Sequence, residues 1–181
     1  MSKKIFGKPN LRGAVAVGID QSYSGFAITV LDKNFNYYTE VYKPEGTGVE
    51  RLSDLRNYTE DFLSDYDVQK TCIEGYAFGS QMANMAGELG GMLRLLMYDL
   101  YPAVPQARFP LVVPPTSLKK YVAGKGTGVS KSQMLLAVYK KWDVDFTDDN
   151  AADSYGLARI VMNKHDFEYE KEVYDKLTSK G

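Results

Sequence analysis

Three short strand-like segments follow one another in the first quarter of the chain, and they limit the possible fold more than any other feature. Residues 14–19 and 26–31 are apolar runs, and residues 37–42 are rich in tyrosine and other residues that favour strands. A turn-forming segment, residues 32–34, separates the second run from the third. The sequence therefore predicts a three-stranded antiparallel meander.

From residue 52 onward the pattern is that of helices alternating with strands. Apolar residues at helical spacing predict a helix around residues 52–62, and short apolar runs predict strands at 71–73 and 111–113. Further helices are expected at residues 80–100, 116–123, 131–142, 149–163 and 166–181. A meander followed by alternating helices and strands predicts an α/β fold, in which helices flank a mixed sheet.

The composition is that of one globular domain spanning residues 1–181. Hydrophobic residues make up 44% and charged residues 25% of the 181 residues, which are ordinary values. No apolar stretch is long enough to cross a membrane, and the basic start lacks the apolar core of a signal peptide. We therefore expect a protein with no membrane partner.

The counts of cysteine and histidine exclude several kinds of chemistry. The lone cysteine, Cys72, cannot form an internal disulfide, and a reducing cytoplasm fits best. The single histidine, His165, excludes a zinc site built on several histidines and disfavours a histidine-based catalytic triad. Chemistry in this chain must depend on carboxylates, lysines, hydroxyls or a bound metal ion.

Charge is segregated along the chain, although the net charge is only -1. Residues 1–12 form a basic N-terminal arm, and residues 166–181 form a charged C-terminal helix. From Thr116 to Trp142 the only charged residues are Lys119, Lys120, Lys125, Lys131, Lys140 and Lys141. Several aspartates follow directly, namely Asp143, Asp145, Asp148, Asp149 and Asp153. Solvated faces explain many such lysines, but a basic segment can also contact phosphates in a protein of low net charge.

Two carboxylates follow apolar runs directly. Asp20 ends the first run, and Glu74 follows Cys72 and Ile73. A carboxylate at the mouth of a buried strand costs desolvation energy unless it has a partner, and ligands of open α/β sheets collect at this edge. Either both residues belong to one site, or each ends its strand and faces water.

A third contribution comes from the start of the helix expected at residues 149–163. Asp149 and Asp153 lie within roughly 40° of one another on a helix, on the face that Leu157 and Ile160 continue. Favourable contact with the helix dipole explains acids in the first turn, but it does not explain Asp153 on the packing face. Four carboxylates favour Mg²⁺ or Mn²⁺, and two such ions about 4 Å apart can hydrolyse a phosphodiester.

At this point the residues resemble a family, the RuvC-like Holliday junction resolvases, and in particular the phage-encoded branch. Gly18-Ile19-Asp20, Ile73-Glu74 and residues 150–158 (NAADSYGLA) look like the acidic motifs of that family. The lysine-bearing segment of the family is similar to residues 115–120, 124–126 and 131–133, and residues 86–91 resemble its Gly-rich helix. The similarity covers residues 15–161, and the order and spacing of the motifs make it fairly specific.

The resemblance implies an RNase H-like fold with a five-stranded mixed sheet, made of the meander and two parallel strands. It also implies a homodimeric, Mg²⁺-dependent endonuclease of DNA recombination and repair, with two ions in each active site and Mn²⁺ as a substitute. The substrate would be a four-way (Holliday) junction or other branched DNA. If the protein is phage-encoded, it would act in the host cytoplasm.

The same resemblance assigns roles to individual residues. Asp20, Glu74 and Asp153 would be metal ligands, and Lys119 would lie near the scissile phosphate. Lys131 would match the second lysine of the family if one residue is inserted in the loop 124–130. The residues expected to contact DNA are Lys119, Lys120, Lys125, Lys131, Tyr76 and Phe78.

Two positions depart from the family pattern. An acid often stands three residues before the last aspartate, where this chain has Asn150. Helical geometry makes Asp149 the best substitute, with Asp148 less well aimed, so three residues remain possible. The family can also carry a junction-probing aromatic residue three positions after the glutamate. Ala77 stands there, between Tyr76 and Phe78, and the sequence leaves open which ring would act.

Two alternatives compete with a nuclease. A junction-binding dimer with a vestigial site would bind branched DNA without cutting it. Gly18-Ile19-Asp20 also resembles the first phosphate motif of actin-like ATPases and sugar kinases, but we find no second phosphate loop. The methionine-rich helix over residues 80–100 fits a core and subunit interface better than a cofactor site.

Overall fold

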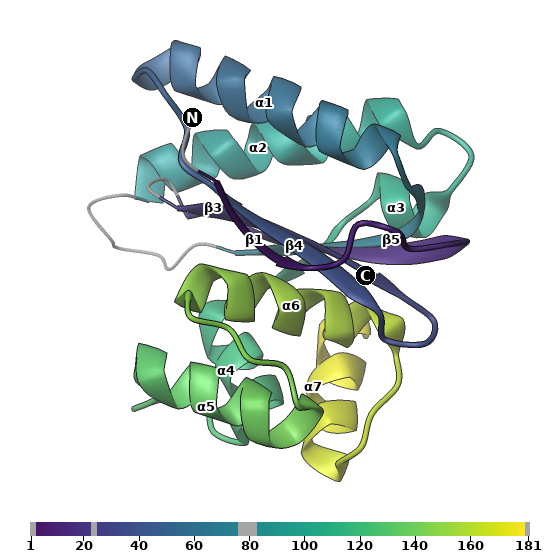
Figure 1. Cartoon of the computed structure of the whole chain (residues 1–181), viewed down its shortest axis with the longest axis vertical. Helices are drawn as coiled ribbons and strands as arrows, with labels where there is room; N and C mark the ends of the chain where they lie inside the picture. The colour runs from purple at the N-terminus through teal and green to yellow at the C-terminus, as the bar shows by residue number, and fades with distance from the viewer. Residues whose placement is uncertain (1–2, 23–24, 76–82, 180–181) are drawn as a thin grey trace.

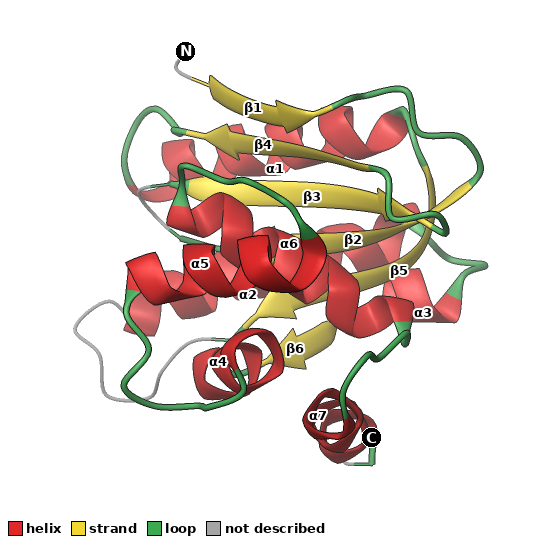
Figure 2. Cartoon of the chain, turned by 60° about the horizontal axis from the view of Figure 1, so that its bottom comes forward, coloured by secondary structure: helices red, strands yellow, loops and turns green. Residues whose placement is uncertain are grey.

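The fold is a layer of helices on each face of a six-stranded sheet (Figure 1). A computed structural model describes residues 3–22, 25–75 and 83–179. The strands are β1 (Lys3–Gly7), β2 (Ala14–Asp20), β3 (Phe26–Asp32), β4 (Tyr37–Tyr42), β5 (Asp67–Glu74) and β6 (Leu111–Val113). Their order across the sheet is β1-β4-β3-β2-β5-β6 (Figure 2). The predicted α/β class with a mixed sheet is therefore confirmed.

The predicted pairing of the strands is confirmed, but the strand count is wrong by one. β2, β3 and β4 form the antiparallel meander, and β5 and β6 add in parallel to β2. The sixth strand is β1, which pairs antiparallel with β4 and lies inside the segment expected to be a basic arm. β1 is almost wholly exposed, so it lacks the apolar run by which the other strands were found. Its backbone pairs with the edge of β4 that the meander leaves open.

The helices divide between the two faces of the sheet. The helices α1 (Gly48–Ser64), α2 (Ala83–Leu100) and the short α3 (Pro105–Arg108) cover one face. The other face carries α4 (Pro115–Ala123), α5 (Lys131–Trp142), α6 (Asp149–Met162) and α7 (Glu168–Thr178). Over the described residues, each predicted helix is present within one turn of its expected bounds or extends beyond them, and α3 was not predicted. Residues 80–82 and 180–181, at the ends of two predicted helices, lie outside the described residues. None of the described helices is long and apolar enough to cross a membrane.

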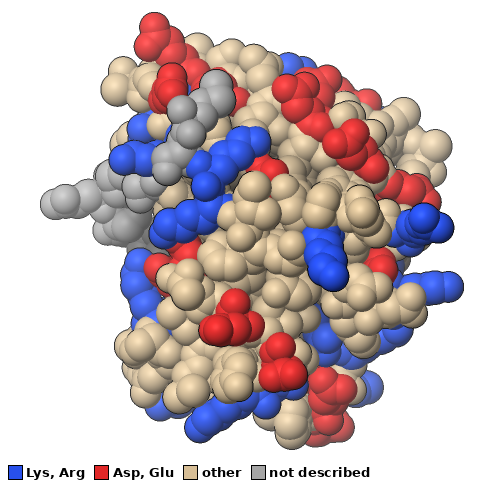
Figure 3. All heavy atoms as spheres, viewed as in Figure 1, with Lys and Arg blue, Asp and Glu red and all other residues tan. Residues whose placement is uncertain are grey.

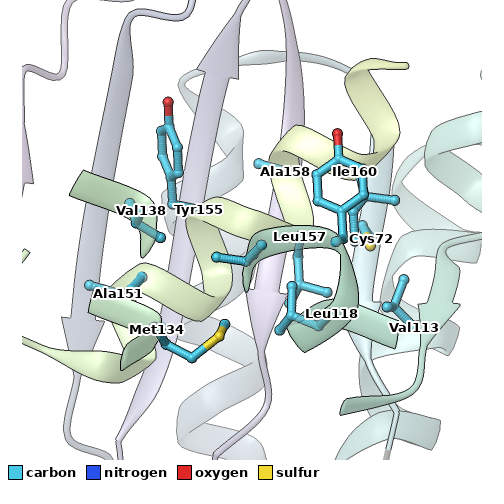
Figure 4. Close-up of a cluster of buried hydrophobic side chains, with 14 of the residues drawn as sticks. Cys72, Val113, Leu118, Met134, Val138, Ala151, Tyr155, Leu157, Ala158 and Ile160 are labelled. Carbon is cyan, nitrogen blue, oxygen red and sulfur yellow. The ribbon is translucent and has the colours of Figure 1, made fainter. Parts of the chain in front are cut away.

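The helix α6 lies at the centre of its layer and packs directly on the sheet. Its buried side chains meet apolar residues of α4, α5, β5 and β6 in one cluster (Figure 4). Gly18 on β2 makes this approach possible, because a Cβ there would lie 2.1 Å from the Ser154 carbonyl oxygen. The Ser154 hydroxyl also lies 2.7 Å from the Thr29 hydroxyl on β3. These contacts fix the start of α6 against the end of β2.

Candidate active site

Asp20 and Glu74 lie side by side because they end two adjacent parallel strands. β2 and β5 pair in parallel up to Ile19 and Ile73, so the next residue of each strand is at the same edge of the sheet. The two carboxyl groups share a hydrogen bond, and the Ser22 backbone N–H donates to Asp20 Oδ1 at 3.1 Å. Only 3% of Asp20 is exposed. The structure therefore places these two acids next to each other at one edge of the sheet.

Burial and mutual repulsion determine the electrostatics of this pair of carboxyl groups. Burial raises the pKa of Asp20 well above its usual value, and the charges of Glu74 and Asp153 raise it further. Burial also raises the pKa of Glu74, partly offset by the hydrogen bond with Asp20 and the charge of Lys119. Neighbouring carboxylates that cannot all ionise at neutral pH are a common feature of functional sites.

Asp153 completes a triad of acids from the first turns of α6. Burial raises the pKa of Asp153 to about 8, with added repulsion from Glu74 and Asp149. Its Oδ1 atom is buried and has no hydrogen-bond partner among the described residues. A buried oxygen in this state costs free energy unless a ligand reaches it.

Two of the predicted lysines face these acids. The Lys131 ammonium lies 2.5 Å from Asp149 Oδ2, and the charge of Lys119 lowers the pKa of both Glu74 and Asp153. Lys131 is the first residue of α5, and Lys119 lies on α4. The structure thus brings together all six residues that the sequence singled out for catalysis: Asp20, Glu74, Asp149, Asp153, Lys119 and Lys131.

Of the other predicted DNA contacts, Lys120 and Lys125 lie outside the acid cluster. Lys120 forms an ion pair with Glu172 on α7 at 3.0 Å, and Lys125 is exposed in the loop after α4. Tyr76 and Phe78 fall outside the described residues.

The three residues left open for the fourth ligand now differ in their contacts. Asp148 caps α6, accepting from the Asn150 backbone N–H at 3.1 Å, and its other oxygen accepts from the Lys4 ammonium at 2.6 Å. The Asn150 amide lies against Gly25, where a Cβ would meet Nδ2 at 2.6 Å. Asp149 is the one whose charge acts on Asp153. The geometry favours Asp149.

Gln21 is a site residue that the sequence analysis missed. Its side-chain amide donates to the Glu74 carbonyl oxygen at 2.5 Å, which ties the end of β5 to the residue after Asp20. Gly90 on α2 leaves room for this side chain, since a Cβ there would lie 2.8 Å from Gln21 Oε1. The small residues of α2 were the available signal, but a glycine pattern does not say which side chain approaches it. Gly87 and Gly91 of the same helix have open space instead.

The donor set suits a hard divalent cation, although the side chains are not in coordinating positions. All the candidate ligands are carboxylates, and the buried Oδ1 of Asp153 has no hydrogen-bond partner among the described residues, which fits a hard cation. Among the residues that the structure describes, no group of three or more acidic, histidine or cysteine side chains is arranged to hold a metal ion as it stands. A bound ion would have to replace the hydrogen bond between Asp20 and Glu74.

Comparison with solved structures identifies the fold. A RuvC structure from Thermus thermophilus is similar at a TM-score of 0.63 and 17% identity, covering 91% of this chain and 96% of that one. Thermus thermophilus RuvC in complex with a Holliday junction substrate gives 0.64, 16% identity and the same coverage. The yeast mitochondrial Holliday junction resolvase Ydc2 gives 0.57 and 15% identity, over 92% of this chain and 86% of that one. No protein-family model matches the chain, and no curated protein sequence matches it either. The chain therefore has the RuvC-like, RNase H-like fold.

Proposed function

We propose that this protein is a metal-dependent endonuclease that nicks four-way DNA junctions. The observation that carries the proposal is the buried cluster of Asp20, Glu74 and Asp153, which has an unpartnered oxygen and two lysines beside it. A fold similar to that of RuvC, including RuvC in complex with a Holliday junction, makes branched DNA the favoured substrate.

Each residue of the cluster has a role in this proposal. Asp20, Glu74 and Asp153, with Asp149 as the fourth acid, would hold two Mg²⁺ or Mn²⁺ ions. When bound, such ions activate a water molecule and stabilise the leaving oxygen of the phosphodiester. Lys119 and Lys131 would bind the phosphate beside the cleaved bond, and Gln21 would hold the Glu74 backbone in place.

The lysine-rich segment over α4 and α5 supports DNA binding. Lys120, Lys125 and Lys140 lie on this segment beyond the acids, at positions that leave them partly or fully exposed. Phosphate contacts made by such lysines release counterions, so junction binding should weaken steeply as salt rises. A duplex of the same length should bind more weakly than a junction.

A second copy of the chain is the proposed partner. The side of α2 and the edge strand β6 expose large apolar residues together, among them Leu95 at 63%, Tyr98 at 44% and Val112 at 43%. These residues line one hollow with Arg108 and Phe109. Exposed apolar patches often mark subunit interfaces, and a four-way junction requires two symmetric cuts. Leu95→Glu should therefore convert a dimer to a monomer in light scattering.

The decisive experiment compares labelled four-way, three-way, flap and linear duplex DNA, each with Mg²⁺, with Mn²⁺ and with EDTA. We expect nicking of the four-way junction in Mg²⁺, none in EDTA and little of the linear duplex. Asp20→Asn should abolish nicking and keep junction binding. The matched control is Asp67→Asn, which removes the same charge at the exposed start of β5 and should cut normally. Cleavage by Asp20→Asn at close to the wild-type rate would contradict the proposed active site.

One observation favours a second candidate, a junction-binding protein that does not cut. The Lys131 ammonium pairs directly with Asp149, so a lysine charge already balances the fourth acid of the cluster. Tight junction binding without cleavage in either metal would establish this alternative. No comparable observation favours the phosphotransferase.

A further inference from the structure

A groove unrelated to the acid cluster runs between α1 and the strands β1 and β4. The helix α1 lies on the sheet face opposite α6 (Figure 1). The groove has a volume of about 520 Å³. Its walls combine aromatic rings with acids and hold a single lysine. The lining residues are Lys3, Pro9, Tyr38, Glu40, Tyr42, Asp54, Asn57, Tyr58, Asp61, Phe62, Asp65 and Tyr66.

The helix α1 and the two residues that follow it, Asp65 and Tyr66, contribute two rows to this groove. One row consists of acids, Asp54, Asp61 and Asp65, and the other consists of the rings of Tyr58, Phe62 and Tyr66. Figure 3 shows acidic side chains gathered over α1 on this face. Asp61 and Asp65 are one helical turn apart, where like charges repel, and neither carboxylate has a hydrogen bond or ion pair to the described residues.

Lys3 shows how the groove receives a cation. Its ammonium lies 3.0 Å from Glu40 Oε2 and 4.8 Å from the centre of the Tyr58 ring. The Tyr58 ring stacks on Tyr42 with 4.0 Å between centroids. A cation held between a carboxylate and a ring face gains both a charge-assisted hydrogen bond and a cation–π contact.

Hydrogen bonds and the Lys3 ammonium favour the ionised form of Glu40, which lines the groove. It accepts hydrogen bonds from Tyr38 at 2.6 Å and from Tyr58 at 2.8 Å. Burial would raise the pKa of Glu40, but these hydrogen bonds and Lys3 lower it below its usual value. Lys3 balances this one acid, so Asp54, Asp61 and Asp65 leave the groove with an excess of negative charge.

We propose that this groove binds an extended basic segment of a partner protein through its arginine or lysine side chains. The spacing supports an extended peptide: Asp61 and Asp65 are about 6 Å apart along the helix, and alternate residues of an extended chain are about 6.7 Å apart. Alternate basic side chains would thus each meet one acid, with their stems against Phe62 and Tyr66. This site does not depend on the proposed nuclease activity.

The test is a binding titration of the full chain with the capped peptide Arg-Gly-Arg-Gly-Arg, followed by calorimetry and tyrosine fluorescence. We expect one peptide to bind per chain. The variant Asp61→Asn/Asp65→Asn should weaken binding at least tenfold. Its matched control, Asp67→Asn/Asp143→Asn, removes two exposed acids outside the groove and should bind as the wild type does. Tyr66→Leu keeps an apolar contact with Phe62 but removes the ring face, and should weaken binding severalfold.

Several outcomes would overturn the proposal. Equal affinities for the wild type, the groove variant and the control would show that binding reflects net charge alone. If a peptide with citrulline in place of each arginine bound equally well, positive charge would not be what the groove recognises. Equal binding of spermidine would assign the groove to a small polyamine instead of a protein segment. Junction cleavage by Asp61→Asn/Asp65→Asn should stay at the wild-type rate, which separates this test from that of the proposed function.

Discussion

The two ends of α6 both carry buried charges, but among the described residues only those at one end form ion pairs with an opposite charge. At the C-terminal end the Arg159 guanidinium lies 3.9 Å from the Phe35 ring centre and 4.7 Å from that of Trp142, and it pairs with Asp166 at 3.3 Å. Nearby, the buried Lys141 pairs with the buried Glu170 and donates to the Tyr121 carbonyl at 2.6 Å. At the N-terminal end Asp153 keeps a buried oxygen without a partner.

This difference separates charges that serve the fold from the acids that we propose to bind metal ions. A buried charge is tolerated when a counter-charge and hydrogen bonds surround it, as they do at Lys141. Three acids that repel one another in a buried place reduce stability, so a fold alone gives no reason to keep them. The predictions below test this distinction.

The largest effect is expected at the unpartnered end. Asp153→Asn should lower the rate of junction cleavage by about a thousandfold, or about 4 kcal/mol of transition-state stabilisation, because the substitution would remove one of the proposed metal ligands. Junction binding, measured by a gel shift in EDTA, should change little. Asp166→Asn makes the same substitution at the other end of the helix and should leave cleavage unchanged. Equal cleavage rates for the wild type and Asp153→Asn would show that the acids at the N-terminal end of α6 are not needed for cleavage.

The partnered end should instead show a large effect on stability. Lys141→Ala leaves Glu170 buried without its counter-charge, which we expect to lower the free energy of unfolding by about 3 kcal/mol. Lys140→Ala removes the same charge from the exposed neighbour and should change stability by less than about 0.5 kcal/mol. Both values come from urea denaturation. A loss of similar size in the two variants would show that burial of Lys141 is not what matters.

The two ends should also respond differently to pH in the absence of metal. The pKa of Asp153 is raised to about 8 from an ordinary value of 3.8, first by burial and then by its acidic neighbours. Between these values the folded state keeps a proton that the unfolded state has released, so the free energy of unfolding falls as pH rises. Relative to Asp153→Asn, the wild type should lose on the order of 2 kcal/mol between about pH 4 and pH 8. A constant difference across this range would contradict the raised pKa.

Bound metal should reverse that penalty. Mg²⁺ at a hundred times its dissociation constant stabilises a folded protein by about 2.7 kcal/mol, and Asp153→Asn should lose most of this gain. The thermal midpoint of the wild type, measured with and without millimolar Mg²⁺, gives the comparison. A thermal midpoint that does not change when Mg²⁺ is added would count against metal binding at the cluster.

Much of the fold and of the acid cluster could be predicted because strong local signals carried them. The apolar runs of β2 and β3 end where the structure ends them within a residue, and the parallel pairing of β2 and β5 follows from the crossover between them. The side-by-side placement of Asp20 and Glu74 needed only that pairing. The helical spacing of Asp149 and Asp153 needed only the period of the helix.

The remaining features depend on contacts between distant segments, which no local pattern reports. β1 is held by the edge of β4, so its own exposed residues gave no strand signal. Lys4 reaches Asp148 across 144 positions of the sequence, and Gln21 reaches the Glu74 backbone across 53. The paired charges around Lys141 also looked like ordinary members of a lysine-rich segment, because burial decides their role and the sequence does not display it.

The smallest predicted effect concerns the one exposed partner at the well-paired end. Asp166 is 58% exposed while Arg159 is only 6% exposed at the side chain, so water screens their ion pair on one side. Asp166→Asn should therefore cost about 0.5 kcal/mol in urea denaturation, because Arg159 keeps its contacts with the rings of Phe35 and Trp142. The double variant Phe35→Leu/Asp166→Asn should lower the free energy of unfolding by more than Asp166→Asn alone, because it also removes a ring face that water cannot replace. If Asp166→Asn instead lowered stability as much as Lys141→Ala, the buried charge of Arg159 would be stabilised by the Asp166 carboxylate and not by the rings of Phe35 and Trp142. The tolerance of buried charge at this end would then rest on ion pairs alone.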